Sequence, residues 1–339
     1  VQSPSEIPYE DDPNFITQEN EVSTRITTSV PGYMGTCFVI DSNDNYFICC
    51  QTPNNIKKVT PDGQTEIFWT GNNNYPAHIT IDKNDNLFIS RKGGTPPYEI
   101  TKITPEGVES EYWSSTESPG PITIDSNNDL ICVIYNQNDP AINTKICRIK
   151  SDNSQETIID LSPNIENKVI NNFNITSITT NSKDELFMCE LMNDYNSEFN
   201  GARILRFNHE TGIKIIAGNT SLGNNNYQEG MKSYSSLHHP SSITVDTHNN
   251  IYIVEEMSNK VVKIIPNERV LTIAGLETSG NEDGVFSIAK LNNPIDIKIN
   301  KYGIINVLDK NSGNIRSINI GLQKNILQDV TPSRLLTLR

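Results

Sequence analysis

The side chains of this chain that could support acid–base or metal chemistry are few, and they lie in separate segments. Glu190, Glu255 and Asp309 each end an alternating apolar run, whereas His78 and Asp296 each begin one. Carboxylate oxygens that converge from different segments can bind Ca²⁺, and a well-placed histidine can act as a general base. One hypothesis is therefore a metal-dependent hydrolase or lyase, with His78 and Asp296 as its catalytic candidates.

Glu190, Glu255 and Asp309 have a second interpretation, in which each carboxylate caps its own loop by accepting backbone N–H bonds. The neighbouring histidines His238 and His239 give little support to a metal site, because adjacent side chains of an extended strand point to opposite sides. The favoured expectation is therefore that the three acids are structural. No metal or other cofactor is predicted, and Ca²⁺ belongs only to the enzyme alternative.

The six cysteines form no C-x-x-C pair, which disfavours a zinc ribbon. Counting residues across the hairpins places Cys37 opposite Cys50 and brings Cys132 next to Cys147. Two disulfides there would indicate an oxidising compartment; alternatively, all six are small buried apolar residues. Asn174 and Asn219 stand in N-x-S/T sequons, and both are candidate glycosylation sites. These features lead to the expectation of an extracellular, cell-surface or particle-surface protein.

The elements that position these residues are repeated. Six segments each read as an alternating strand, a turn rich in Asn, Asp or Gly, and a second strand. They are residues 37–50, 78–90, 121–134, 177–190, 242–255 and 296–309. A third alternating run follows each segment, and a fourth follows most of them. Six four-stranded antiparallel units that cover one another predict an all-β, six-bladed β-propeller.

The propeller is expected to be a single domain over residues 22–330, with an extended tail at 1–21 and a C-terminal tail at 331–339. The strand that closes the ring has two candidates. Residues 22–29 resemble the outer strand that precedes the second unit, and residues 325–330 could fill the same place. The sequence does not choose between them.

Two stretches, 215–246 and 272–300, share a further pattern: Ala-Gly, a Gly-containing loop, an acid followed by Gly, then Leu, Pro and a strand. This block, together with the hairpins, resembles NHL repeats over residues 22 to about 322. The resemblance implies a six-bladed propeller that serves either as a binding platform or, in fewer cases, as an enzyme. It also implies that an acid at the position of Glu190, Glu255 and Asp309 caps its own loop.

Alternation along the first strand of each unit predicts which side chains face the central channel. The predicted pairs are Cys37/Val39, His78/Thr80, Pro121/Thr123, Ser177/Thr179, Ser242/Thr244 and Asp296/Lys298. Asp296 is the one carboxylate of this set, so the pattern does not predict a calcium-binding group. His78 has no evident nucleophile beside it. The expectation is a channel lined by threonine and serine that holds ordered water.

The formal net charge of −14 argues against a nucleic-acid partner, and no apolar run of the sequence is long enough to span a membrane. Aromatic residues in the inserted loops of units 3 to 5 are candidate interface anchors, namely Tyr195, Phe199, Tyr227 and Tyr234. The sequence therefore favours a non-enzymatic platform. Its partner would be a protein or a glycan, bound through one face and these loops, and it could serve as a component of a larger assembly.

Overall fold

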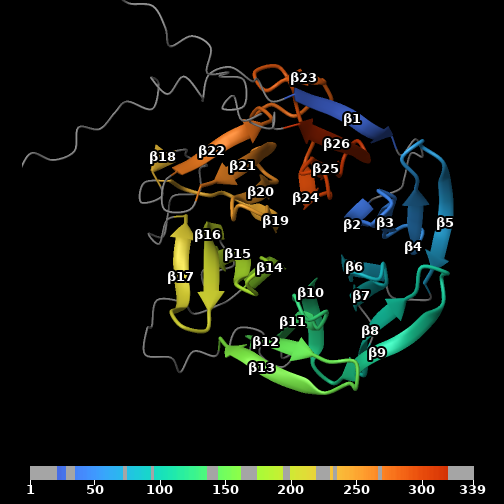
Figure 1. Cartoon of the computed structure of the whole chain (residues 1–339). Coiled ribbons are helices and arrows are strands. Elements are labelled where there is room, and N and C mark those ends of the chain that lie inside the picture. The colour runs from blue at the N-terminus through green and yellow to red at the C-terminus, as the bar shows by residue number, and fades with distance from the viewer. Residues whose placement is uncertain are drawn as a thin grey trace, which may run out of the picture.

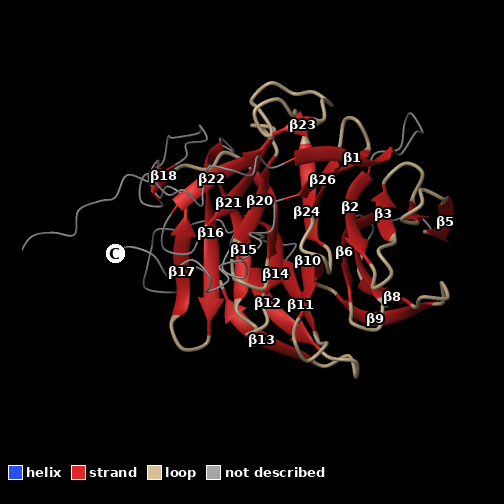
Figure 2. Cartoon of the chain, turned by 45° about the horizontal axis from the view of Figure 1, so that its top comes forward, coloured by secondary structure: helices blue, strands red, loops and turns tan. Residues whose placement is uncertain are grey.

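The structure is a computed structural model. It describes residues 21–27, 35–71, 75–92, 95–135, 144–161, 174–193, 199–218, 230–231, 235–265 and 269–319. The described residues form strands, turns and loops, without a helix (Figure 2). No helix that could cross a membrane occurs among them.

The strands form six antiparallel sheets arranged around a central axis (Figure 1). Blade 1 consists of β2 (Gly35–Ile40), β3 (Tyr46–Cys50), β4 (Asn55–Val59) and β5 (Thr65–Thr70). Blade 2 consists of β6 (Tyr75–Ile81), β7 (Leu87–Lys92), β8 (Tyr98–Ile103) and β9 (Glu109–Ser115). Blade 3 consists of β10 (Ser118–Ile124), β11 (Leu130–Tyr135), β12 (Thr144–Ile149) and β13 (Gln155–Asp160). Blade 4 consists of β14 (Asn174–Thr180), β15 (Leu186–Asn193), β16 (Phe199–Asn208) and β17 (Gly212–Ala217). Blade 5 consists of β19 (Pro240–Val245), β20 (Ile251–Glu255), β21 (Lys260–Ile264) and β22 (Arg269–Ala274). Blade 6 consists of β24 (Pro294–Ile299), β25 (Ile305–Asp309), β26 (Asn314–Asn319) and β1 (Glu21–Thr27). The predicted six-bladed β-propeller is confirmed.

Two short strands extend the outer edges of the last two blades. β18 (Gly230–Met231) pairs with β22, and β23 (Gly284–Val285) pairs with β1. Both belong to the loops that enter blades 5 and 6, where the repeated Gly-containing block occurs in the sequence. These loops therefore cover outer strands as well as connecting blades.

The N-terminal segment closes the ring. β1 pairs antiparallel with β26 from Glu21↔Asn319 to Thr27↔Asn314, and Val22 is fully buried in the core of blade 6. Of the two candidate closing segments, the structure thus shows residues 21–27 in this role. Residues 325–330 lie outside the described part of the chain.

The hydrophobic core lies between neighbouring blades. One cluster joins Val39, Cys49 and Trp69 of blade 1 to Ile79 and Ile89 of blade 2, and five similar clusters occupy other positions around the ring. Each sheet buries both faces against its neighbours, which a single sheet could not do alone. The inner strands are thereby held at fixed positions around the axis.

The cysteine predictions are corrected by the register of the strands. Cys37 lies opposite Cys49, and Cys50 lies opposite Gly35. The hairpin turn is one residue longer than expected because the Asp41 carboxylate accepts the N–H groups of Asn43 and Asn45, which keeps Asp41 in the turn. Cys132 does lie opposite Cys147. All six cysteines are nevertheless buried free thiols, as in the alternative interpretation.

The turns between the first two strands of each blade share one conformation. Their fourth residue has positive φ in every blade, with values from 58° to 77°, and these residues are Asp44, Asp85, Asn128, Asp184, Asn249 and Gly303. Asp and Asn tolerate the left-handed region better than other side chains do. The first residue of four of these turns is an aspartate, and Asp41, Asp82, Asp125 and Asp246 each accept two backbone N–H bonds within their own turn.

In five of the six blades the fourth turn residue also links the blade to the one before it in the ring. Asp85 accepts the N–H and hydroxyl of Ser42 at 2.9 and 2.6 Å, and Asp184 accepts the same groups of Ser126 at 2.7 and 2.6 Å. Asn128 accepts the backbone N–H of Lys83. Asn249 and Asp44 accept from the side-chain amides of Asn181 and Asn300, which are the first residues of their turns. Gly303 of blade 6 has no side chain for such a bond. We call this set of contacts the turn ring.

Candidate functional site

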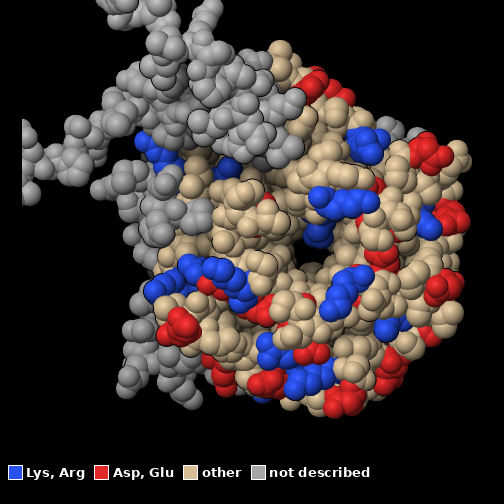
Figure 3. All heavy atoms as spheres, viewed as in Figure 1, with Lys and Arg blue, Asp and Glu red and all other residues tan. Residues whose placement is uncertain are grey.

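The central channel contains a cavity of about 450 Å³. The space-filling view shows its opening near the centre of the ring (Figure 3). All twelve side chains that alternation along the inner strands predicted to face the channel line this cavity: Cys37, Val39, His78, Thr80, Pro121, Thr123, Ser177, Thr179, Ser242, Thr244, Asp296 and Lys298. The predicted lining is therefore confirmed.

Hydroxyl groups near the start of the inner strands hold the blades together. Thr36 of blade 1 donates to the Pro76 carbonyl oxygen of blade 2 at 3.2 Å. Thr176 of blade 4 donates to the Pro240 carbonyl oxygen of blade 5 at 2.9 Å. Ser177 accepts the N–H of Ile243 at 3.3 Å. These polar groups line the channel, but their hydrogen bonds are already made between blades.

Asp296 is part of the same inter-blade contacts. Its carboxylate accepts the N–H of Phe38 in blade 1 at 2.8 Å and the hydroxyl of Ser242 in blade 5 at 2.6 Å. It also accepts the N–H of Ile297 at 2.9 Å and pairs with Lys298 Nζ at 2.6 Å. Four donors thus surround a residue that is only 4% exposed. The carboxylate joins three blades, and both of its oxygens accept hydrogen bonds from protein donors.

A second set of side chains faces the channel, and its hydroxyl groups differ from the first set in their hydrogen bonding. Thr80, Thr123, Thr179 and Thr244 occupy the same position in the inner strands of blades 2 to 5, two residues beyond the level of Asp296. None of their four hydroxyls makes a hydrogen bond within the described part of the chain. Lys298 occupies the same position in blade 6. We call these four residues the threonine ring.

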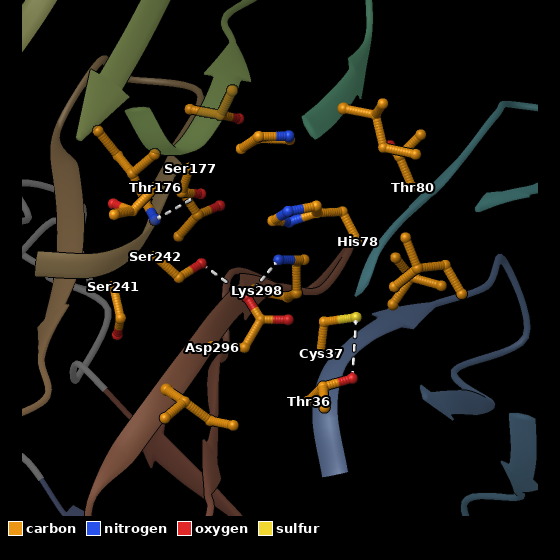
Figure 4. A pocket seen from close by; sticks show the side chains of 18 of the residues that line it. Thr36, Cys37, His78, Thr80, Thr176, Ser177, Ser241, Ser242, Asp296 and Lys298 are labelled. Atoms are coloured by element: carbon orange, nitrogen blue, oxygen red, sulfur yellow. Dashed lines mark hydrogen bonds and ion pairs between the residues drawn. The ribbon is translucent and has the colours of Figure 1, made fainter. Parts of the chain in front are cut away.

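The close-up of the cavity shows how these groups are directed (Figure 4). His78 and Lys298 extend into the cavity from blades 2 and 6, and Thr80 lies on the wall of blade 2. Lys298 Nζ is bonded to Asp296 and lies 5.8 Å from the centre of the Phe38 ring. Its side chain is 28% exposed, so solvent and small molecules in the cavity can reach it. The threonine ring and Lys298 together form a polar belt around the channel.

The cavity lining also includes Gln51, Glu256 and Lys310, each the first residue after the second strand of its blade. Glu256 lies 3.3 Å from His239 Nδ1 and accepts a hydrogen bond from Asn293 at 3.2 Å. The contact with His239 lowers the pKa of Glu256, and the same contact raises the pKa of His239. This pair joins blade 5 to the loop that enters it.

Three of the predicted site residues, which we call the rim acids, do not form a common site. Glu190, Glu255 and Asp309 are fully buried, and none of them lines the cavity. Among the described residues, no cluster of three or more His, Cys, Asp or Glu side chains could hold a metal ion. Within the described part of the chain these three acids thus do not meet in one cluster, and a cation site at their position stays a prediction.

Each rim acid is instead bound locally. Glu255 accepts the N–H groups of His238 and His239 at 2.9 and 3.0 Å, which is the expected loop cap. Burial raises its pKa to about 7. Glu190 pairs with buried Arg203 at 2.6 Å, and burial raises its pKa also.

Asp309 has an arginine partner as well, which the sequence interpretation missed. It lies 3.2 Å from Arg316, and burial raises the pKa of its carboxyl to about 6. Arg316 also donates to Asp283 at 2.6 Å and to the carbonyl oxygens of Glu282 and Lys290. Its position in a polar, alternating strand was compatible with exposure, so the sequence held no clear sign of its burial.

Most of the other predicted site residues fall beyond what is described. Tyr195, Tyr227, Tyr234 and Asn219 lie outside the described residues, and of Phe199 only the backbone, at the start of β16, is described. Asn174 is exposed at the start of β14. The interface and glycosylation assignments therefore stay predictions.

Comparison with known proteins supports the fold and little beyond it. No protein-family model matches the chain, so the NHL assignment stays a prediction. The Arabidopsis thaliana protein "SUPPRESSOR OF QUENCHING 1, chloroplastic" is 28% identical over 115 residues, which cover 32% of this chain and 11% of that protein. The chain thus spans only about a tenth of this curated relative.

Solved structures of other proteins share the architecture, among them the following three. A Bacteroides thetaiotaomicron protein of unknown function has a TM-score of 0.70 and is 14% identical; the match covers 88% of this chain and 75% of that protein's chain. An auxiliary nutrient binding protein of the same species has a TM-score of 0.68 and 15% identity, covering 90% and 77%. Virginiamycin B lyase of Staphylococcus aureus has a TM-score of 0.56 and 15% identity, covering 88% and 99%. At these identities the likeness shows the fold alone.

Proposed function

We propose that this propeller is a non-enzymatic binding protein that holds a small hydroxylated ligand, such as a sugar unit of a glycan, in its central channel. The observation that carries the proposal is the threonine ring, whose four hydroxyls have no hydrogen-bond partner within the described part of the chain. A platform of the NHL type that is secreted or displayed on a surface would be consistent with this role.

The chemistry of the channel suits a polyol. A hydroxyl group both donates and accepts, so a circle of threonines can bond sugar hydroxyls in several orientations. The cavity of about 450 Å³ lies within the usual range for small-molecule sites. The methyl groups of the threonines and the ring of Pro121 supply apolar surface between the polar groups. Such a mixed wall matches the alternating polar and apolar surface of a sugar ring.

The enzyme alternative has weaker support from the same geometry. A hydrolase or lyase that uses Asp296 would need its carboxylate directed into the channel, but Asp296 is bonded to donors in blades 1, 5 and 6. The auxiliary nutrient binding proteins of Bacteroides thetaiotaomicron and Bacteroides ovatus show that this fold occurs in binding proteins. The fold also occurs in a lyase, so the channel side chains, and not the fold, decide between the two.

The test is a titration of the purified chain with neutral monosaccharides, followed by isothermal calorimetry. The double variant Thr123→Val/Thr179→Val removes two hydroxyls from the ring and keeps the side-chain volume. We expect it to weaken binding about tenfold to a hundredfold, because each neutral hydrogen bond contributes roughly 0.5–1.5 kcal/mol.

Thr70→Val is the matched control, because Thr70 is exposed on the outer strand β5 and lies far from the channel. Its affinity should equal that of the unchanged protein. If no sugar binds, or if the double variant binds as tightly as the control, the channel is not the site and the proposal fails.

A further inference from the structure

We propose that the ligand of the channel carries a carboxylate, and that Lys298 binds this group at the level of the threonine ring. The ligand class is thus an acidic sugar, such as a hexuronate. This inference rests on the proposed function and refines it, because the threonine ring alone would accept neutral and acidic sugars alike.

The ammonium group of Lys298 has hydrogen-bond donors beyond the one that its ion pair with Asp296 uses. An ammonium group carries three N–H donors, and one of them is directed to Asp296 Oδ1 at 2.6 Å. Nζ also lies 5.8 Å from the centre of the Phe38 ring, which accepts no conventional hydrogen bond. No acceptor for the remaining donors lies among the described residues, so they are available to a ligand in the cavity, which the side chain lines.

The ion pair with Asp296 does not use up the positive charge of Lys298. The Asp296 carboxylate also accepts the N–H groups of Phe38 and Ile297 and the hydroxyl of Ser242. Three neutral donors thus stabilise the same negative charge, and they hold it on the wall of the channel. Lys298 remains the part of the pair that reaches into the cavity.

The surroundings favour an anion at this level over a cation. The groups at the same position in the other blades are the four threonine hydroxyls and the apolar side chain of Val39. His78 extends into the cavity from blade 2, two residues nearer the start of its strand than Thr80 (Figure 4). A carboxylate here would accept from the Lys298 ammonium and from threonine hydroxyls. The remaining hydroxyls of the sugar would face the rest of the ring.

The experiment compares D-glucose with D-glucuronate, which differ in a single carboxylate, by calorimetry at neutral pH. We expect glucuronate to bind about tenfold to a hundredfold more tightly, which is the usual contribution of a charge-assisted hydrogen bond. Lys298→Gln should abolish this preference, so that the ratio of the glucuronate affinity to the glucose affinity falls to about one. Lys298→Arg should keep it.

Lys214→Gln is the control, because it makes the same change in net charge at an exposed position of β17. Circular dichroism and the melting temperature show whether Lys298→Gln is folded. If it is not, Lys298→Arg decides alone, since loss of the preference in a folded Arg variant would contradict a charge-based site. A disaccharide that ends in glucuronate then distinguishes a free sugar from the end of a glycan.

The outcomes separate the two proposals. If glucose and glucuronate bind equally, and the Thr123→Val/Thr179→Val variant binds both more weakly, the binding function stands and the acidic-ligand inference is overturned. If the preference for glucuronate persists in Lys298→Gln, another group recognises the carboxylate and the inference is also overturned. If neither sugar binds, both proposals are lost.

Discussion

At the scale of single residues, buried carboxylates are the main feature that sequence alone misassigns. Glu190, Glu255 and Asp309 recur at one position of successive blades, which made a shared cation site conceivable. In the structure, one caps a loop and two pair with an arginine. What the repeat fixes is the place of the acid in the blade, whereas its partner depends on local residues.

The pKa of Glu255 leads to a prediction about pH. Its value is about 7 in the folded protein against a usual 4.5, so the folded state binds the extra proton between these values. The free energy of unfolding should therefore fall as the pH rises from 4.5 to 7, with the full cost present above 7. Glu255→Gln removes the charge. Its free energy of unfolding should therefore exceed that of the unchanged protein by an amount that grows to about 3 kcal/mol as the pH rises through this window.

Urea unfolding at several pH values measures this difference. Glu66→Gln is the control, because the Glu66 side chain is 65% exposed. A difference between Glu255→Gln and the unchanged protein that is constant with pH would show that Glu255 is ionised in the folded state throughout.

At the scale of elements, the hairpin turns combine local conformation with contacts between blades. Asp184 has a φ of 58° and accepts two bonds from Ser126 of the preceding blade. Its backbone conformation and its side chain therefore contribute separately to stability. Two substitutions can distinguish the contributions.

Asp184→Gly loses the contacts but permits positive φ, whereas Asp184→Ala loses the contacts and also strains the backbone. We expect the Ala variant to be less stable than the Gly variant by about 1 kcal/mol. Both should be less stable than the unchanged protein, as measured by urea unfolding. Equal stability of the Ala and Gly variants would mean that the turn relaxes out of the left-handed conformation.

The elements were largely predictable from the sequence. The repeated hairpins give the blades, and alternation gives the twelve channel residues, because a strand buried on both sides must keep its period of two. The register of Cys37 was not predictable in the same way. It depends on Asp41 remaining in the turn, and counting residues does not show the hydrogen bonds that keep it there. The absence of partners for the threonine ring also required coordinates, since serines and threonines one level away are bonded between blades.

At the scale of the whole molecule, Arg316 connects the closing strand to the rest of blade 6. It bonds Asp309 of β25 and Asp283 of the loop, and Asp283 in turn accepts the N–H and hydroxyl of Thr24 in β1. The guanidinium is fully buried. Closure of the ring thus depends on a charged group in the interior as well as on the backbone pairing of β1 with β26.

Arg316→Met should lower the free energy of unfolding by about 3–5 kcal/mol, because it leaves the Asp309 carboxylate buried without its partner. The double variant Arg316→Met/Asp309→Asn removes that unpaired charge and should recover part of the loss. Thermal unfolding of the three proteins measures both effects. A single variant as stable as the unchanged protein would show that the β1 pairing alone closes the ring.

The turn ring has a direction, which bears on the order in which the chain is made. The fourth turn residue of each of blades 2 to 5 bonds the blade before it. When each of these blades is synthesised, the blade that it bonds has therefore already been made. Blade 6 has Gly303 at this position, and its contact comes instead from Asp44 of blade 1. β1 leaves the ribosome before any blade but finds its partner β26 only when the last blade is complete. Of the strands in the ring, the one synthesised first is thus the last to be paired.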